Sequence, residues 1–444
     1  MTSLTIAVIG AGISGLSAAW LLSKRHRVVL YEAGDYAGGH SNTIDVPVAD
    51  GTTCPVDTGF IVYNPPNYPN LCALFDHLDV PTKPAPMTFA VSMDGGAYEY
   101  SGTRLGGLFG QPSTLLSPAH WRMLKDILRF FKNAPQDAER LSVDCTLGTY
   151  LQQEGYSQSF VERHLLPMAG AIWSAPVDEM MHYPLRAFVR FFHNHGLLKV
   201  SNRPPWRTVD GGSRAYVDQL LADGAFKVRL SSPVRSVSRH PGGATVTDET
   251  GHAQRFDHVV LAAHADQSLA LLKDANAEET SLLQAFGYTD NLAVVHSDPR
   301  LMPKRKSLWS SWNYMGGGAE TGALTVSYWM NALQSLGIER DVFVTLNPAE
   351  EPEEAHKIAQ FAYQHPLFTA DALRAQEALW SLQGRANTWF CGSYFGAGFH
   401  EDGLQSGLAV AEDLGGLQRP WQVAGASSRI VRHAQPAAVL EAAE

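Results

Sequence analysis

Two short apolar runs near the start of the chain predict buried strands with a helix between them. The runs are Thr5–Ile9 and Arg27–Tyr31, and the stretch that separates them is rich in alanine and leucine. Continuous apolar runs of this length are typical of strands that are covered on both faces. The chain is therefore expected to begin with a strand, a helix and a second strand.

From about residue 65 to residue 203 the pattern changes to helical periodicity. In residues 120–132 one helical face is apolar and another is basic. The two sets are Trp121, Leu124, Leu128 and Phe131, and Arg122, Lys125, Arg129 and Lys132. Such a helix can lie on an anionic membrane surface, or it can pack on a protein core as an ordinary surface helix. The pattern leaves both interpretations open.

Two further stretches of this region are apolar and aromatic. Residues 165–176 include Trp173, and they can wall a substrate pocket or form ordinary core. Residues 185–207 are rich in phenylalanine, histidine and arginine. They can flank the mouth of an apolar tunnel, or they can form a core helix with solvated arginines.

The second half of the chain predicts strands. Residues 228–238 predict a strand pair around Pro233, and residues 255–263 run apolar, as a buried strand does. Residues 292–295 and 325–330 are also predicted strands, and the aromatic residues around them fit an antiparallel sheet that floors a pocket.

Composition and charge limit the function classes. A chain of 444 residues is too long for a single core, so two domains are expected. A net charge of −10 argues against nucleic acid as a partner. The four cysteines are scattered without a CxxC pair, which favours free thiols in a reducing cytoplasm and predicts no disulfide frame and no metal site. We expect no signal peptide and no membrane span, since no apolar run reaches about 18 residues.

The glycines after the first apolar run supply the first candidate chemistry. Gly10, Gly12 and Gly15 have GxGxxG spacing. In such a motif the first glycine allows a tight turn, the second lets a pyrophosphate approach the backbone, and the third lets the helix pack on the strand. The helix N-terminus offers N–H groups to the phosphates, and Glu32 stands where an acid binds a ribose. A dinucleotide, NAD or FAD, is therefore expected.

Three later motifs add to this prediction. Residues 38–41 are Gly-Gly-His-Ser, and residues 56–60 end an apolar strand at Thr-Gly-Phe. Residues 389–407 predict a strand, a glycine-rich loop and a helix, and Asp402 and Gln405 have the spacing of a capping box. The N-terminus of that helix can stabilise the negative charge of a reduced flavin.

These motifs resemble the flavin amine oxidase, protoporphyrinogen oxidase and phytoene desaturase superfamily. The resemblance implies an α/β fold in which a Rossmann-type FAD-binding domain carries an inserted, mixed α+β substrate domain. Its FAD domain would comprise residues 1–64, 206–265 and 386–418. Its substrate domain would comprise residues 65–205, mostly helical, and 266–385, mostly sheet. Residues 419–444 are expected to be a surface tail.

The second glycine motif favours FAD over NAD, and the lack of a cysteine in its loop implies non-covalent FAD. The residues expected to bind FAD are Gly10, Gly12, Ile13, Ser14, Gly15, Glu32, Ala33, Gly38, Gly39, His40, Ser41, Thr58, Gly59, Phe60, Val234, Gly392, Ser393, Phe399, His400, Glu401, Gly403, Leu404 and Ser406.

Two departures from the superfamily pattern bear on the chemistry. An arginine commonly follows the double glycine, but His40 stands there. Many amine oxidases also carry a lysine in the strand that matches residues 291–296, and this chain has none there. His40 and His400 are the candidate catalytic residues, because imidazole titrates near neutral pH. A hydrogen bond to the cofactor is the other interpretation of each.

Within the superfamily the chain is most similar to a bacterial branch of predicted NAD/FAD-binding proteins. Genes of that branch often lie near cyclopropane-fatty-acyl synthase-like methyltransferases. This suggests an FAD-dependent oxidoreductase that removes a hydride from, or desaturates, an unsaturated or methylated fatty-acyl (phospholipid) chain. The alternatives are an amine or isoprenoid/carotenoid oxidase, an FAD-dependent double-bond isomerase, and a non-catalytic flavoprotein partner of a lipid methyltransferase. The expected location is the cytoplasm, free or at the inner membrane face.

Overall fold

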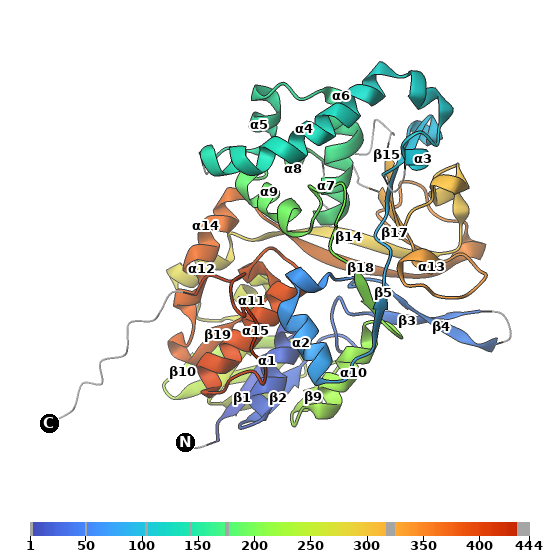
Figure 1. Ribbon diagram of the computed structural model, residues 1–444. Coiled ribbons are helices and arrows are strands. Elements are labelled where there is room, and N and C mark those ends of the chain that lie inside the picture. Colours follow the sequence, from blue (N-terminus) through green and yellow to red (C-terminus); the bar gives the residue numbers. More distant parts are fainter. Residues whose placement is uncertain are drawn as a thin grey trace.

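The molecule has two structural halves, and five parallel strands from distant parts of the sequence form the sheet of the first one (Figure 1). The computed structural model describes residues 3–48, 51–102, 105–142, 144–173, 177–316 and 325–432. β1 lies at the centre of this sheet, and the predicted order of strand, helix and strand is confirmed. In spatial order the strands are β19 (Thr388–Phe390), β13 (His258–Leu261), β1 (Thr5–Ile9), β2 (Arg27–Tyr31) and β9 (Lys227–Arg229).

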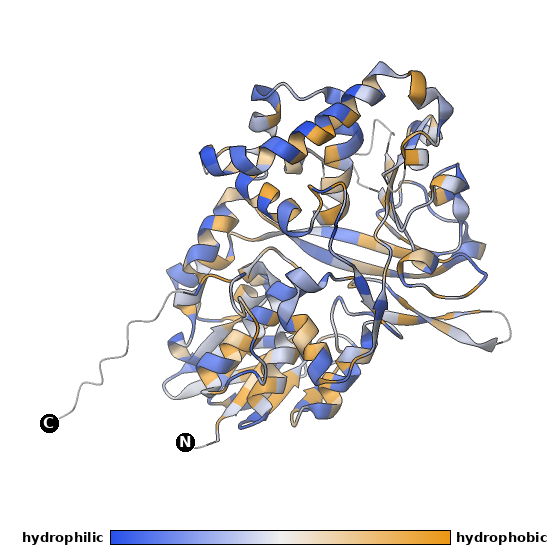
Figure 2. Cartoon of the chain, in the orientation of Figure 1, coloured by the Kyte–Doolittle hydropathy of each residue, from blue (hydrophilic) through white to orange (hydrophobic). Residues whose placement is uncertain are grey.

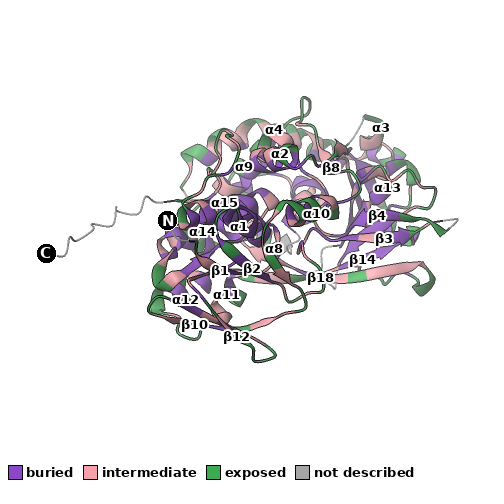
Figure 3. Cartoon of the chain, turned by 90° about the horizontal axis from the view of Figure 1, so that it is seen from below, coloured by how far each residue is buried: buried purple, intermediate pink, exposed green. Residues whose placement is uncertain are grey.

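Helices α1 (Ile13–Ser23) and α15 (His400–Gly415) pack against each other beside this sheet. Every residue of α1 is buried, which explains why its sequence is apolar or small on all sides (Figure 3). A Cβ on Gly407 of α15 would lie 2.2 Å from the carbonyl oxygen of Ser14, so only glycine permits this approach. α10 (Arg214–Asp223) also packs on α1.

A three-stranded antiparallel sheet extends this half of the molecule. It comprises β10 (Val234–His240), β11 (Gly243–Asp248) and β12 (Ala253–Phe256). The expected strand pair around Pro233 is wrong in one respect. Strands do flank the proline, but β9 belongs to the parallel sheet and β10 to the antiparallel one, because the proline turn redirects the chain.

A seven-stranded mixed sheet forms the second half. In spatial order its strands are β18 (Lys357–Leu367), β14 (Gly287–His296), β17 (Phe343–Leu346), β16 (Thr325–Trp329), β15 (Trp312–Gly316), β6 (Phe89–Met93) and β7 (Tyr98–Ser101). The predicted strands at residues 292–295 and 325–330 lie in it. β6 and β7 come from the stretch expected to be mostly helical, and they close one edge of the sheet.

Helices cap this second sheet on the side away from the parallel sheet (Figure 1). They are α3 (Leu105–Leu108), α4 (Pro118–Arg140), α5 (Leu147–Gln153), α6 (Gln158–Phe160), a π turn at Val161–Leu165, α7 (Leu166–Trp173), α8 (Val177–His182) and α9 (Leu185–Asn194). Figure 2 shows mixed polar and apolar residues in this cap, whereas the strands of the parallel sheet at the opposite end of the molecule are more uniformly apolar.

The remaining strand pairs and α-helices lie around these sheets. They are the two-stranded pairs β3 (Thr43–Pro47) with β4 (Thr53–Asp57) and β5 (Thr82–Pro84) with β8 (Arg207–Val209), and the helices α2 (Pro69–His77), α11 (Ala265–Leu271), α12 (Ala277–Leu283), α13 (Met330–Leu333) and α14 (Ala370–Ala378).

Buried apolar residues gather in two cores. One core surrounds the parallel sheet with α1, α2 and α15, and the other lies between the seven-stranded sheet and the helical cap. Val46 and Val56, which come from the first predicted FAD segment, pack in the second core. No helix among the described residues is both long and apolar enough to cross a bilayer.

The segment after α15 was expected to be a surface tail, but residues 419–432 are anchored to the body. Arg419 is buried, and its guanidinium pairs with Glu412 and donates to Asn70 Oδ1 at 2.8 Å. The Trp421 ring stacks on Trp20. The rest of the predicted tail, residues 433–444, lies outside the described residues.

Candidate active site

A cavity of about 1220 Å³ runs from the carboxyl ends of the parallel strands into the helical cap. The residues expected to bind FAD that line it are Gly10, Gly12, Ile13, Ser14, Glu32, Ala33, Gly38, Gly39, His40, Thr58, Gly59, Phe60, Val234, Gly392, Ser393, Phe399 and His400. Those that do not line it are Gly15, Ser41, Glu401, Gly403, Leu404 and Ser406.

The three glycines of the first motif have the geometry that each was expected to need. Gly10 has φ +103°, and a Cβ there would lie 2.8 Å from the oxygen of Ala262. A Cβ on Gly15 would lie 1.9 Å from the oxygen of Gly10, so this glycine serves packing and not ligand contact. A Cβ on Gly12 would meet no atom within 4 Å and would project into the open cavity. The cradle that a cofactor phosphate needs is therefore present at Gly12.

The carboxylate of Glu32 is held in place beside this loop. Its Oε2 accepts a hydrogen bond from the backbone of Ala11 at 2.8 Å, and its Oε1 accepts one from Gly34 at 2.8 Å. The second glycine pair is joined to the first motif, since the N–H of Gly38 donates to the carbonyl of Ala11 at 2.8 Å. The two loops thus form one wall, and each Glu32 oxygen keeps a lone pair for a ribose hydroxyl.

Helix α15 begins three residues earlier than the predicted capping box requires, because its N-cap is Phe399 and not Asp402. Asp402 is the third residue of the helix. Its Oδ2 accepts a hydrogen bond from the backbone N–H of the N-cap residue, Phe399, at 2.8 Å. The guanidinium of Arg429 donates to Asp402 Oδ1 at 2.6 Å. Asp402 is fully buried and therefore fixes the helix N-terminus against the cavity.

The predicted FAD-binding residues that lie behind the loop do not line the cavity and make other contacts. Glu401 is buried, and its carboxylate accepts backbone hydrogen bonds from Asn70 and Leu71, which caps α2. Ser406 Oγ accepts from the N–H of Gly392 at 3.0 Å, and a Cβ on Gly403 would lie 2.8 Å from Ser14 Oγ. These residues shape the walls, as do Ser41 and Leu404.

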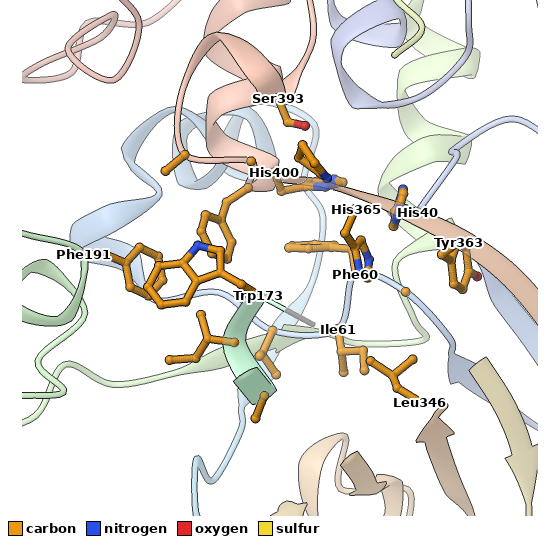
Figure 4. A pocket seen from close by; sticks show the side chains of 18 of the residues that line it. His40, Phe60, Ile61, Trp173, Phe191, Leu346, Tyr363, His365, Ser393 and His400 are labelled. Atoms are coloured by element: carbon orange, nitrogen blue, oxygen red, sulfur yellow. The ribbon is translucent and has the colours of Figure 1, made fainter. Parts of the chain in front are cut away.

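A cluster of imidazoles and a phenol lies where the two halves meet, on the far side of Phe60 from Trp173 (Figure 4). The His40 ring lies 4.9 Å from the Tyr363 ring and 5.3 Å from the His365 ring. Burial holds the pKa of His40 well below its ordinary value, and His365, His264 and His400 lower it further. Burial likewise lowers the pKa of His365 to about 4. These imidazoles are therefore neutral at pH 7.

Tyr363, His365 and His264 were missed by sequence reasoning. The only available signal was that Tyr363 and His365 alternate along β18, which places both on one face of a strand. His40 Nε2, His365 Nδ1 and His264 Nδ1 are buried and have no hydrogen-bond partner within the described residues. All three rings line the cavity, so these atoms are available to a bound molecule.

His400 is held more firmly than His40. Its ring stacks on Phe60 at 3.8 Å, and its Nε2 lies 2.6 Å from the hydroxyl of Tyr216. Burial lowers its pKa to about 3. Of the two predicted catalytic histidines, His400 therefore has a fixed ring, whereas His40 has a ring nitrogen without a hydrogen-bond partner among the described residues.

Beyond Phe60 the cavity becomes apolar. Its walls there include Leu124, Ile127, Leu128 and Phe131 of α4, Met168, Ile172 and Trp173 of α7, and Phe191 of α9. The apolar face predicted for residues 120–132 thus lines a cavity, while α4 packs on the core through Met123 and Phe130. The described residues 165–173 and 185–207 also contribute walls, although part of each stretch is ordinary core. Residues 174–176 of the predicted stretch lie outside the described residues.

Charged groups are scarce in this apolar arm. Within the described residues, Glu32 is the sole carboxylate on the cavity lining, and it lies at the glycine-loop end. Arg203 lines the arm, its Nε donates to the carbonyl of Lys199 at 2.8 Å, and it forms no ion pair with any described residue. No group of three possible metal ligands occurs among the described residues.

His164, a buried histidine on the cavity lining, allows a test of how the stability of the protein depends on pH. Burial lowers its pKa to about 3, and the cation of Arg203 lowers it further. The unfolded chain binds a proton near pH 6.5 while the folded chain does not, so His164 costs stability as pH falls, at about 1.4 kcal/mol per pH unit. In His164→Gln the thermal midpoint should therefore fall less steeply between pH about 7 and about 5. Exposed His193 of α9 supplies the matched control, His193→Gln, whose slope should equal that of the parent protein. Equal slopes in all three proteins would contradict the expectation.

Comparisons with known proteins agree with this geometry. A family model described as flavin containing amine oxidoreductase matches residues 13–338. A Mycobacterium tuberculosis protein named as a flavin-containing monoamine oxidase, AofH, is 25% identical over 356 residues, which are 77% of this chain and 70% of that protein.

Solved structures share the fold at lower identity. A protein from Exiguobacterium named as a protoporphyrinogen oxidase has TM-score 0.65 and 17% identity, with 94% of this chain and 99% of that chain covered. Putrescine oxidase bound to putrescine has TM-score 0.66 and 16% identity, covering 93% and 99%. A fatty acid isomerase from P. acnes that produces CLA has TM-score 0.64 and 14% identity, covering 93% and 97%.

The residues present fit FAD. The space at Gly12 admits a pyrophosphate, the N-termini of α1 and α15 face the cavity, and Glu32 is positioned for a ribose. The described part of the glycine loop at residues 392–400 contains no cysteine, as expected for non-covalent binding.

Proposed function

This chain belongs to the family of flavin-containing amine oxidoreductases and is an FAD-dependent oxidoreductase of that family; we propose that its substrate is a fatty-acyl chain of a lipid. The observation that carries the proposal is the apolar arm of the cavity, which extends from Phe60 to α4. A linear hydrocarbon gains about 0.8 kcal/mol for each methylene that it buries. A long arm whose walls are mostly aliphatic and aromatic side chains therefore favours a long apolar chain.

The charges of the arm argue against an amine. A protonated amine that enters a low-dielectric cavity needs a carboxylate or an aromatic cage to replace its hydration. No described carboxylate lines the apolar arm, and Arg203 would repel a cation there. The same guanidinium attracts a carboxylate or phosphate, which is the head group of a fatty acid or phospholipid. We therefore do not extend the monoamine oxidase activity in the name of the mycobacterial relative to this chain.

The proposed roles of the side chains follow from their geometry. FAD, when bound, supplies a two-electron hydride acceptor. The glycine loops and the helix N-termini would hold its phosphates, and the apolar walls would exclude water from the reacting carbon. His40 and His365 are neutral at pH 7, so we assign them hydrogen bonds through their unpartnered nitrogens. The proton that leaves the neighbouring carbon as the double bond forms would pass through one of these neutral imidazoles to solvent. Reoxidation requires molecular oxygen or another electron acceptor.

A double-bond isomerase is the second candidate. The fatty acid isomerase with the same fold supports it only as precedent, because 14% identity indicates fold alone. An isomerase would use the same apolar arm without net oxidation. A methyltransferase partner, suggested by the sequence, stays a prediction.

An anaerobic spectrum of the FAD-loaded protein separates these functions. We would add detergent-dispersed unsaturated or methyl-branched fatty acids and their phospholipids, and follow the flavin band at about 450 nm. Loss of the band with a new double bond in the lipid is the expected result. A persistent band with relocated double bonds would indicate an isomerase. A persistent band with unchanged lipid would contradict both the proposed oxidation of a fatty-acyl chain and the alternative isomerase function.

Arg203→Gln should raise KM for a chain with an anionic head about tenfold, because a charge-assisted contact of about 1.5 kcal/mol is lost. Its kcat should change little, since a head-group contact is the same in the ground state and in the transition state. The matched control is Arg190→Gln, which removes an exposed cation from α9. The methyl ester of the same acid should not distinguish the variants. An equal KM for acid and ester in the parent protein would refute a head-group role.

A further inference from the structure

Exposed apolar side chains gather around one end of the cavity. Eight large hydrophobic residues are exposed among the described ones, and six of them lie at this end: Leu105, Leu115, Leu116, Trp121, Leu128 and Val200. Leu105, Trp121, Leu128 and Val200 also line the cavity, so they form its rim. Soluble surfaces rarely concentrate such residues without a partner.

Contacts within the rim join α4 to the turns that precede it. Trp121 Nε1 donates to the carbonyl of Leu115 at 2.9 Å, which ties α4 to the turn before it. The Phe109 ring lies 5.0 Å from the Trp121 ring and links α4 to the turn after α3. Leu116 is 88% exposed and continues the surface away from the cavity. We call these six residues the apolar rim.

Unpaired cations flank the apolar rim on α4. Arg122, Lys125 and Lys132 are exposed and form no ion pair with any described residue. At 100° per residue they lie on the helical face next to Trp121 and Leu128. Arg129 is used differently, since it lies over the Tyr156 ring and near Glu154.

The local charge is opposite to that of the whole chain. Residues 105–132 contain four arginines and lysines and one aspartate, a net charge of +3, whereas the chain carries −10. The aspartate, Asp126, is buried and accepts a hydrogen bond from the backbone of Ser157. An anionic surface would therefore be attracted to this face and repelled by the rest of the molecule.

We propose that the apolar rim and the cations Arg122, Lys125 and Lys132 dock the protein on an anionic phospholipid bilayer, so that a lipid acyl chain reaches the cavity from the membrane. The proposal rests on the proposed function for the identity of the chain that enters. The rim residues would lie among the acyl chains and the three cations among the head groups. A second copy of this chain is a poorer occupant, because the exposed cations Arg122, Lys125 and Lys132 of the two copies would repel each other.

Vesicle flotation of the full-length, FAD-loaded protein tests this directly. Vesicles that mix phosphatidylglycerol with phosphatidylcholine should bind the protein, and binding should weaken as salt rises, since the Debye length shrinks. Vesicles of phosphatidylcholine alone should bind far less. No binding to either type would overturn the proposal, whatever the outcome of the activity measurement.

The cations have a matched control. Replacing Arg122, Lys125 and Lys132 together by glutamine should lower the partition coefficient about a hundredfold, because each cation near an anionic surface contributes about fivefold. The control replaces the exposed cations Arg27, Lys227 and Lys273 of the other half by glutamine and should bind as the parent protein does. Equal losses in both triple variants would indicate an unspecific charge effect and overturn the proposal.

The apolar rim is tested by Leu115→Ser with Leu116→Ser, since neither residue lines the cavity. This variant should lose vesicle binding and turnover of vesicle lipid but keep turnover of detergent-dispersed substrate. Loss of both turnovers, with vesicle binding kept, would contradict docking through the rim. Analytical ultracentrifugation tests the other possible occupant of the rim, a second copy of this chain. If the parent protein were a dimer and this variant a monomer, the rim would serve self-association, and membrane docking would be overturned.

Discussion

A Gly12→Val variant is expected to fold and to purify without FAD. A Cβ at Gly12 meets no atom of the chain within 4 Å, and the backbone there has φ −73°, which valine adopts without strain. The side chain would instead fill the space in which the pyrophosphate must approach the backbone. We expect FAD affinity to fall at least about a hundredfold, which corresponds to about 2.7 kcal/mol. The ratio of flavin to protein absorbance in the purified variant measures the loss.

Two glycines serve as controls for this variant. Gly106 of α3 also has no atom within 4 Å of its virtual Cβ and no positive φ, and it does not line the cavity, so Gly106→Val should keep FAD. Gly15→Val should fail differently, by unfolding, because its Cβ would lie 1.9 Å from a backbone oxygen. Normal FAD content in Gly12→Val would show that the cofactor does not approach this glycine.

The second large effect is expected from Arg429, the cation that pairs with buried Asp402. In Arg429→Met the fully buried carboxylate loses its charged partner, and breaking a buried pair from one side costs about 3–5 kcal/mol. Asp402 also caps α15, so the helix N-terminus at the cavity should loosen and FAD should dissociate faster. Thermal unfolding of the apo protein and FAD release kinetics are the two measurements.

Arg432→Met is the matched control, because Arg432 pairs with Asp413 where both side chains are about one third exposed. Such a surface pair contributes about 1 kcal/mol or less. The double variant Asp402→Asn with Arg429→Met should recover part of the loss, since no unpaired charge is then buried. If Arg429→Met and Arg432→Met lowered the thermal midpoint equally, the buried pair would not have the role assigned to it.

Local sequence patterns predicted the glycine loops well. The close approach of Gly10 to Ala262 is an additional, long-range constraint, but the positive φ of Gly10 and the contact of Gly15 with the oxygen of Gly10 are local, so spacing alone predicts them. The same is true of the GGHS turn, whose Gly38 joins the first motif through a single backbone hydrogen bond. The α/β fold and the family followed from these motifs.

Contacts between distant segments could not be predicted in the same way. The His365 ring lies 5.3 Å from the His40 ring although β18 is far from His40 in the sequence, and no short-range pattern predicts such a contact. Glu401 looked like a cofactor ligand because it adjoins His400, yet its carboxylate turns to the backbone of Asn70. The anchored segment after α15 was missed because its arginines resemble a solvated tail until Asp402 and Glu412 are placed beside them.

The order of strands in the parallel sheet has a consequence for biosynthesis. β13 ends at Leu261, but its neighbour β19 is translated about 130 residues later and supplies one edge of the sheet. At a translation rate of about 5–20 residues per second, the edge of β13 stays unpaired for about 6–26 s before β19 has been synthesised. The loop that completes the cofactor cradle, residues 392–400, emerges later still. A nascent chain therefore holds an open, aggregation-prone strand edge until nearly the whole polypeptide has been made, and it can take up its cofactor only at the end.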